Sequence, residues 1–456
     1  MVIKINNLWI PKIKEKKDNI NTNSWFNILK CNNPNKKLEK SYIDINNEKI
    51  IRTRKIFIYP NNEQKIILHK WFNNYIDVYN KTNNFISDKI FENNELIVKN
   101  IKYINFRDIR DKEMVKYKDE LSKETKINKH LLDEAIKHNV TMYKSCISNM
   151  KNKNIKDFRI RTLSKDKRRK NLVIESNLIS KNKNGFCVSI LNEMKTENNF
   201  KFQEIKNTFI LQYDNFYKKY YLLIPIEITK VDNNLEYHMK KSNILKTNKI
   251  KNIKKIKNNI NNRIKVDNKC GIDGGVRTFL TVYNDNETLE ICNNVKSTFK
   301  PLLKRIDRTT MLKDNGIINE RKYKKSITKK HNKIENKIKD LHWKASNYLC
   351  KRYNTICIGK LNTRSIVDNK KSNICKLTKR LLYTLSHYRF RMILESQCEK
   401  FNCFFKVINE YNTSKCCNRC KEKNDVGSSK IYKCSSCDIE LDRDVNASIN
   451  IYNKFI

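Results

Sequence analysis

Two cysteine pairs, Cys417-Asn418-Arg419-Cys420 and Cys434-Ser435-Ser436-Cys437, are separated by residues 421–433. Each pair forms a tight knuckle that offers two thiolates, and together the two pairs supply the four thiolates of one tetrahedral zinc site. The interval is slightly short for such sites, but Gly427 lies in it and can form the turn of a two-stranded ribbon. The pattern therefore predicts a structural zinc site at Cys417, Cys420, Cys434 and Cys437.

A redox dithiol is the alternative, and it leaves two Cys-x-x-Cys pairs unexplained. Cys416 precedes the first ligand, so a register shifted by one residue also stays open. A closed four-thiolate site has no open coordination position, so this zinc is expected to be a scaffold rather than a catalyst.

Acidic residues occur in two segments around the cysteine pairs. Asp273 lies in Gly271-Ile272-Asp273-Gly274-Gly275-Val276, within a strand candidate that covers residues 271–283. The alternative for this segment is an ordinary turn that contains an aspartate. Asp442 and Asp444 begin the last predicted helix, where N-terminal capping is the alternative role and suits Asp442 best. Asp444 could project from the first turn toward a metal.

Phosphodiester cleavage by two magnesium ions needs acids that converge from separate segments. Magnesium prefers hard oxygen ligands and keeps some of its water. Asp273 and Asp444 meet part of this requirement, and the spacing alone does not identify a third acid.

The composition favours a polyanionic partner. The 456 residues, enough for two or three domains, include 96 Lys and Arg against 48 Asp and Glu, which gives a formal charge of +48. Nucleic acid is the natural partner and an anionic membrane is the rival, although no apolar run is long enough for a spanning helix. The chain is rich in Asn, Lys and Ile, so part of the lysine excess reflects an AT-rich genome. Fifteen cysteines without a secretory signal predict an intracellular, reducing compartment.

Strands and helices alternate in the C-terminal half, which predicts an α/β sheet. Hydrophobic periodicity predicts helices at about 62–80, 319–352, 377–401 and 444–455, and strands at 49–59, 288–292, 355–358 and 403–408. Residues 207–213 and 216–228 are predicted to form a hairpin that turns at Asp214-Asn215. Residues 165–170 (KDKRRK) are expected to be a basic loop, and residues 238–266, with ten Lys or Arg and no acid, a basic linker or a solvated helix.

The order of these motifs resembles the transposon-encoded TnpB nucleases and their Fanzor relatives. The resemblance rests on Gly271-Ile272-Asp273-Gly274, then Thr413-Ser414-Lys415 and the cysteine pairs, then residues 442–451 (DRDVNASINI). Weaker N-terminal similarities are Tyr59-Pro60, Glu63-Gln64, Trp71 and Tyr79-Asn80, so the resemblance extends from about residue 50 to the C-terminus. By this resemblance, Asp273 is the first acid of a RuvC-type site and Asp444 is the third.

One position departs from the TnpB pattern. TnpB nucleases carry a glutamate at the end of the middle strand, and here Gly359 occupies that position. Fanzor proteins resemble TnpB with the glutamate moved to the next strand, where this chain has Glu410. The move is physically reasonable because neighbouring strands lie about 4.8 Å apart. The alternative for Glu410 is an ordinary solvated acid. Ser386–Arg391 also looks Fanzor-like, and its arginines either contact phosphate or form a plain basic helix face.

The resemblance implies a multidomain α+β protein with an oligonucleotide-wedge β-barrel, an inserted helical recognition lobe and an RNase H-like (RuvC) α/β domain that carries the zinc ribbon. The expected divisions are 1–48, a loosely ordered extension; 49–60, the first wedge strand; 61–165, the recognition lobe; 166–230, the wedge barrel; 231–266, the basic linker; 267–412, the first part of the RuvC domain; 413–440, the ribbon; and 441–456, the C-terminal RuvC helix.

The implied activity is RNA-guided cleavage of double-stranded target DNA, with two magnesium ions held by Asp273, Glu410 and Asp444. One protein chain is expected per guide RNA, and the nucleus is the expected location in a eukaryotic host. Two rivals remain. A transposase would form multimers and join DNA ends, and an inactive binder of RNA and DNA would explain Gly359.

Overall fold

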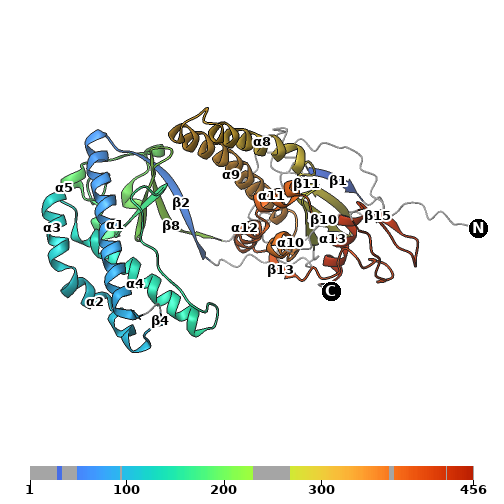
Figure 1. The fold of residues 1–456 in the computed structure, drawn as a ribbon, viewed down its shortest axis with the longest axis horizontal. Helices are drawn as coiled ribbons and strands as arrows, with labels where there is room; N and C mark the ends of the chain where they lie inside the picture. The colour runs from blue at the N-terminus through green and yellow to red at the C-terminus, as the bar shows by residue number, and fades with distance from the viewer. Residues whose placement is uncertain are drawn as a thin grey trace, which may run out of the picture. The chain divides into compact units, whose positions relative to one another are not determined.

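The computed structural model describes residues 28–32, 49–92, 95–229, 268–368, 374–427 and 429–454. The chain divides into two compact units, which we describe separately: Lys49–Ile228, and Thr229–Ile456 together with Met1–Glu48 (Figure 1). None of the helices in the described ranges is long and apolar enough to cross a membrane. The predicted basic linker lies outside these ranges, as do most residues of the predicted N-terminal extension.

The first unit contains a five-stranded sheet with the order β5-β7-β8-β2-β6. Its strands are β2 (Lys49–Tyr59), β5 (Arg169–Ile174), β6 (Lys195–Thr196), β7 (Phe209–Asp214) and β8 (Lys219–Thr229). The predicted first strand is confirmed as β2. The β5 and β6 strands are not neighbours in this order, so closure into a barrel stays a prediction.

Two predictions in this unit need correction. The hairpin between β7 and β8 turns over residues 215–218 rather than at a dipeptide, because the Asp214 carboxylate accepts hydrogen bonds from the backbone N–H groups of Phe216 and Tyr217. The predicted basic loop ends early, since Arg169 and Lys170 already pair with β7.

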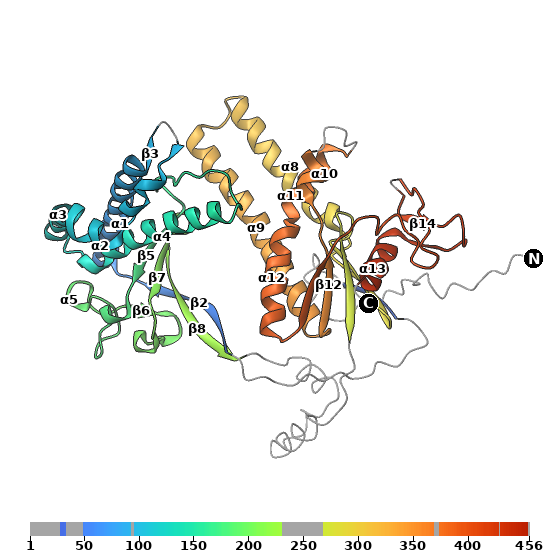
Figure 2. The same cartoon turned by 90° about the horizontal axis from the view of Figure 1, so that it is seen from below.

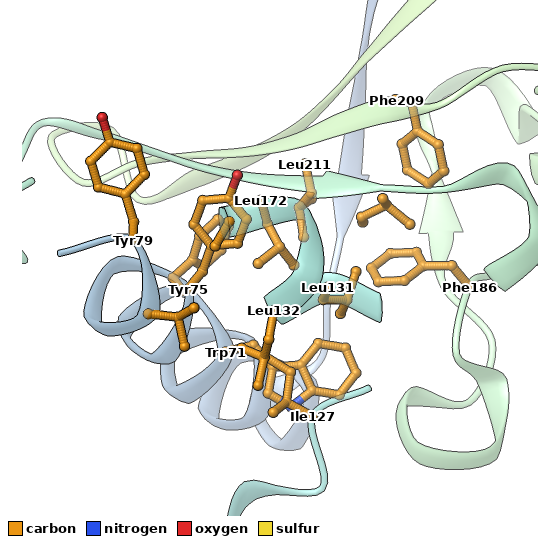
Figure 3. Packing of buried hydrophobic residues seen from close by; sticks show 14 of the residues in the cluster. Trp71, Tyr75, Tyr79, Ile127, Leu131, Leu132, Leu172, Phe186, Phe209 and Leu211 are labelled. Atoms are coloured by element: carbon orange, nitrogen blue, oxygen red, sulfur yellow. The ribbon is translucent and has the colours of Figure 1, made fainter. Parts of the chain in front are cut away.

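Helices pack against this sheet around one apolar core (Figure 3). The helices are α1 (Asn62–Ile90), α2 (Phe106–Asp108), α3 (Val115–Thr125), α4 (Lys129–Lys151) and α5 (Val188–Leu191), and β3 (Phe91–Glu92) pairs with β4 (Glu95–Leu96). The α1 helix begins at a capping box between Asn61 and Gln64 and runs ten residues beyond its predicted end, since its buried face continues through Ile86 and Ile90. Trp71 of α1 and Leu132 of α4 are fully buried in this core.

The second unit is built on a six-stranded mixed sheet with the order β1-β11-β10-β9-β12-β13. Its strands are β1 (Ile28–Asn32), β9 (Lys269–Gly274), β10 (Leu280–Asn284), β11 (Glu287–Ile291), β12 (Thr355–Gly359) and β13 (Phe404–Ile408). The first four in this order pair antiparallel, whereas β9, β12 and β13 are parallel.

Two sequence expectations for this sheet are wrong. The single strand expected over residues 271–283 is two antiparallel strands, because the chain reverses where the N–H of Gly275 donates to the carbonyl of Phe279 at 3.1 Å. The N-terminal extension is not uniformly without regular structure, because residues 28–32 form the edge strand β1 beside β11.

The helices of this unit are α8 (Val295–Asp314), α9 (Glu320–Cys350), α10 (Thr363–Asp368), α11 (Lys376–Leu385), α12 (His387–Lys400) and α13 (Arg443–Asn453) (Figure 2). The helix expected over 377–401 is broken at Ser386, which has a left-handed φ of 51°. A single non-helical residue barely changes apolar spacing, so periodicity carries across the break; Leu385 and Phe390 are both buried. The α8 helix was not predicted.

Candidate functional site

The carboxyl ends of three parallel strands meet at one edge of the six-stranded sheet. Ile272 pairs with Ile358, and Gly359 pairs with Ile408. Asp273 directly follows Ile272, and Gly359 directly follows Ile358, so Asp273 and Gly359 occupy neighbouring positions at the ends of β9 and β12. Glu410 lies two residues beyond the end of β13. The sheet register thus brings two of the three predicted acids to the edge at which Gly359 lies.

The side chain of Glu410 occupies the space directly above Gly359. A Cβ atom added to Gly359 would lie 2.6 Å from Cγ and 2.7 Å from Cδ of Glu410, and it would also collide with the carboxylate oxygen Oε1. These separations are far below van der Waals contact. The Glu410 carboxyl group therefore takes the place into which a side chain at position 359 would project.

The third predicted acid comes from α13, which packs directly on β9. A Cβ atom at Gly271 would lie 2.5 Å from the carbonyl oxygen of Ser448 and 2.6 Å from the nitrogen of Tyr452, so only glycine allows this approach. Asp444 lies in the first turn of α13. Asp442 precedes the helix, and its carboxylate accepts from the N–H groups of Asp444 and Val445, at 2.8 and 3.4 Å. Asp442 is the cap, as the sequence predicted.

The carboxyl groups at this edge have raised pKa values. Burial raises the pKa of the Asp273 carboxyl well above its usual range, and the charges of Asp444 and Glu410 raise it further. Burial also raises the pKa of Asp444, with Asp442 adding to the effect. Burial raises the pKa of Glu410 to about 7 against the opposing charge of Arg391. A group of carboxyls that disfavour one another's ionisation is stabilised by a divalent cation.

Two further observations bear on a cation at this edge. Glu410 Oε1 is buried and has no hydrogen-bond partner among the described residues, which suits a metal ligand. The three carboxylates do not form a set whose oxygens all lie within 4.8 Å of one another; in the described part of the chain only the four cysteines meet that spacing.

The four predicted zinc ligands converge on one point. Their sulfur atoms all lie within 4.8 Å of one another. Cys417 Sγ lies 3.6 Å from Cys437 Sγ, and Cys420 Sγ lies 3.4 Å from Cys434 Sγ. A zinc–sulfur distance of about 2.3 Å places tetrahedral sulfurs about 3.8 Å apart, so this set fits zinc after small adjustments. The antiparallel strands β14 (Ile431–Lys433) and β15 (Glu440–Asp442) form a two-stranded ribbon. The position expected for its turn is wrong, because the hairpin turns over residues 434–439, at the second cysteine pair, and not at Gly427.

The register shifted to Cys416 is excluded because its thiol does not belong to the four-sulfur group. Its carbonyl instead accepts hydrogen bonds from the side chains of Asn446 and Asn450, each at 2.8 Å. Asn446 also accepts from the N–H of Asn418 at 3.0 Å. These two asparagines of α13 fix the ribbon to the helix that carries Asp444, and the sequence analysis assigned them no role. Two buried asparagines four residues apart on an otherwise apolar helix face are the signal that could have identified them.

Known families and proteins are similar to this chain in sequence. The family described as "Cas12f1-like, TNB domain" matches residues 387–451, and the one described as "Probable transposase" matches residues 250–370. TnpB-like proteins L79 and R854 of Acanthamoeba polyphaga mimivirus are each 34% identical to this chain over 97% of its length, and the match covers 85% and 84% of those proteins. Putative transposase A625R of Paramecium bursaria Chlorella virus 1 is 23% identical over 91% of this chain and 89% of its own length.

One solved structure that is similar is a cryo-EM complex of Cas12f1 with sgRNA and target DNA. It is 15% identical, with 89% of this chain and 100% of that chain covered, at a TM-score of 0.33. The matches over nearly the whole chain define the class, which is that of TnpB-like and transposase-like proteins. Within it, the chain belongs to the TnpB-like family, as its motifs indicated.

Proposed function

We propose that this protein is an RNA-guided endonuclease that cleaves double-stranded DNA at the carboxylate edge of its six-stranded sheet. The observation that carries the proposal is the Glu410 side chain lying over Gly359. A glycine in the usual glutamate position would otherwise favour an inactive binder. Because Glu410 fills the same space from the next strand, the chain keeps an acid where the family pattern requires one.

The three acids Asp273, Glu410 and Asp444 would hold two magnesium ions. When bound, magnesium supplies an activated water and stabilises the leaving oxygen of the phosphodiester. Asp273 lies on the central strand β9, where both of its partners influence its ionisation. Asp442 keeps the first turn of α13 in place through its two backbone hydrogen bonds. Three antiparallel strands followed by two parallel ones, with α13 packed on β9, support assignment to an RNase H-like (RuvC) domain.

The ribbon would bind one structural zinc ion through Cys417, Cys420, Cys434 and Cys437. A four-thiolate site leaves no position for substrate, so the zinc contributes to folding and not to hydrolysis. The asparagine contacts between the ribbon and α13 mean that the zinc supports the helix on which Asp444 lies.

The partners would be one guide RNA per chain and a matching DNA duplex. The +48 charge supports a polyanionic partner, and family membership supports a mobile-element origin. A wedge-type barrel and a recognition lobe would form the unit Lys49–Ile228, which combines a sheet with the α1 and α4 helices.

The test is to purify the protein from cells that express its own gene neighbourhood, sequence the RNA that copurifies, and assay cleavage of matching DNA in magnesium. We expect a defined RNA and cleavage that is lost in Glu410→Gln. Absence of a bound RNA would contradict the guided activity, and full cleavage by Glu410→Gln would contradict the role of Glu410.

A DNA transposase is the second candidate, because a matched family and some relatives carry that name. It also uses an RNase H-like acid triad, so the acids do not distinguish the two. Joining of transposon ends by the purified protein without RNA would favour a transposase. Cleavage that follows the sequence of the bound RNA would favour the guided nuclease.

A further inference from the structure

Two arginines at the start of α12 have different surroundings. Arg389 is half exposed, and its Nη1 lies 3.9 Å from the Glu335 carboxylate of α9. Arg391, two residues later, points elsewhere because residues two apart on a helix do not share a face. Its guanidinium carbon lies 5.6 Å from the centre of the Tyr388 ring. The Arg391 Nη1 atom is buried and has no hydrogen-bond partner among the described residues.

The start of α12 lies beside the end of β9, because His387 Nε2 lies 3.1 Å from the Gly275 carbonyl oxygen and a Cβ atom at Gly274 would lie 3.2 Å from His387 Nδ1. Arg391 is four residues after His387 and therefore lies on the same face of α12. Glu410 Oε1, at the neighbouring end of the sheet, is also buried, and neither this atom nor Arg391 Nη1 has a hydrogen-bond partner among the described residues. A buried donor or acceptor that lacks a partner costs about 1–3 kcal/mol. The unpaired donor of Arg391 is therefore explained best by an anionic ligand, and the unpaired acceptor of Glu410 by a cation that this ligand also contacts.

We propose that Arg391 binds a non-bridging oxygen of the phosphodiester that is cut at this site, an inference that rests on the proposed nuclease function. A phosphodiester supplies the anionic oxygen that a guanidinium prefers. Its charge also draws it to the cations that Glu410 would help to hold. Arg391 is thus a substrate-contacting catalytic residue, whereas Arg389 is a surface residue paired with α9.

Arg389 supplies a matched control on the same helix. We expect Arg391→Gln to lower the single-turnover cleavage rate roughly 100-fold, the usual scale for removing one donor from a developing charge. Arg391→Lys keeps the charge and should recover part of the rate, which also shows that loss in the glutamine variant is not misfolding. Arg389→Gln should stay within about twofold of the wild type. A wild-type rate for Arg391→Gln would overturn the inference while leaving the proposed function in place.

A second comparison separates phosphate contact from simple support of Glu410. In the double variant Gly359→Glu/Glu410→Gly, the acid returns to β12. If Arg391 contacts the phosphate, Arg391→Gln still slows cleavage in that background. If it only orients Glu410, the loss disappears there and the inference fails.

A binding measurement decides the matter without cleavage. The probe is a fluorescent target DNA in calcium, titrated with each variant loaded with its guide RNA, or without RNA if none copurifies. We expect Arg391→Gln to weaken binding several-fold and to reduce the salt dependence by about one phosphate contact, more than Arg389→Gln does. Equal affinities of the two variants would overturn the inference even if the wild type proves unable to cut DNA.

Discussion

At the scale of single residues, Gly359 and Glu410 compete for one space. Any side chain at position 359 begins with a Cβ atom, and that atom would collide with Cγ, Cδ and Oε1 of Glu410. The glycine is therefore required by the glutamate on the next strand. Relative to the TnpB pattern, the glycine at position 359 and the glutamate at position 410 are therefore linked, because each residue requires the other.

This competition gives a prediction for Gly359→Ala. The added methyl group must displace the Glu410 carboxyl, so we expect cleavage to fall about as far as in Glu410→Ala, although only one carbon is added. Single-turnover cleavage rates measure both variants. Because each change removes the same carboxyl, the double variant should lose little more than either single one. Full activity of Gly359→Ala would contradict the placement of Glu410.

Some of these residues could be predicted and others could not. The positions of Asp273, Glu410 and Asp444 followed from a motif resemblance, and strand register then explains why Glu410 comes close to Gly359. The burial of Arg391 Nη1 had no such signal, because it depends on the break at Ser386 that sets how α12 is rotated. A residue in left-handed conformation that is neither glycine nor asparagine leaves little trace in sequence periodicity.

At the scale of elements, hydrogen bonds join the ribbon to α13. The zinc ligands can be tested by comparing a ligand cysteine with Cys416, a neighbouring cysteine that is not a ligand. We expect one zinc ion per chain in the wild type and less than one in Cys434→Ser. Metal content of the purified proteins is the measurement, by elemental analysis. Cys416→Ser is the matched control, since Cys416 is adjacent to a ligand but its thiol lies outside the four-sulfur group, and it accepts from Asn446 and Asn450 through its backbone carbonyl. Loss of zinc from the Cys416 variant would restore the shifted register.

A buried histidine of α9, His342, makes the stability of the second unit depend on pH. His342 of α9 stacks on Phe279 at 5.5 Å and bonds through Nε2 to the Leu385 carbonyl at 2.9 Å. The pKa of His342 is lowered from 6.5 to about 4, chiefly by burial and in part by the charge of Arg389, while the hydrogen bond to the Leu385 carbonyl opposes the shift. His387 also stacks on Phe279, at 5.1 Å, and its burial likewise lowers its pKa to about 4.

The direction of the effect follows from proton binding. Between pH 6.5 and 4 the unfolded chain binds a proton at His342 and the folded chain does not, so stability falls as pH falls through this window. With a pKa of 6.5 in the unfolded chain and about 4 in the folded protein, His342 should lower the free energy of unfolding by about 2 kcal/mol between pH 7 and pH 5. Urea unfolding at both pH values is the measurement. In His342→Phe, which keeps a ring on Phe279 but cannot ionise, the difference between the two pH values should shrink by that amount, and an unchanged difference would contradict the assignment.

Elements with long apolar faces were predicted well, and their junctions were not. The strand β12 and the helix α9 matched the pattern closely because both are buried over most of their apolar residues. The reversal between β9 and β10 was missed, since the apolar residues of two short adjacent strands resemble one longer strand. The edge strand β1 was missed because its pairing with β11 joins residues that are very distant in sequence.

At the scale of the whole molecule, the +48 charge has two explanations that make different predictions. If it reflects only the Lys-rich composition of an AT-rich genome, the cations are scattered and few of them meet phosphate together. If the protein holds a guide RNA along its surface, many cations neutralise phosphates at once and release counterions when the RNA binds. The number of cations released can be measured directly.

We therefore expect a steep dependence of RNA affinity on salt. Each phosphate contact contributes a slope of roughly −0.7 in a plot of log K against log salt for single strands, so ten contacts give about −7. Between 0.1 and 0.3 M salt, that slope lowers the affinity by roughly three orders of magnitude. Equilibrium binding of the copurified RNA across this range is the measurement. A scrambled RNA of equal length should show a similar slope at lower affinity, because phosphate contacts carry no sequence information. A slope shallower than about −2 would mean that most of the lysine excess takes no part in binding, and it would remove charge as an argument for a nucleic-acid partner.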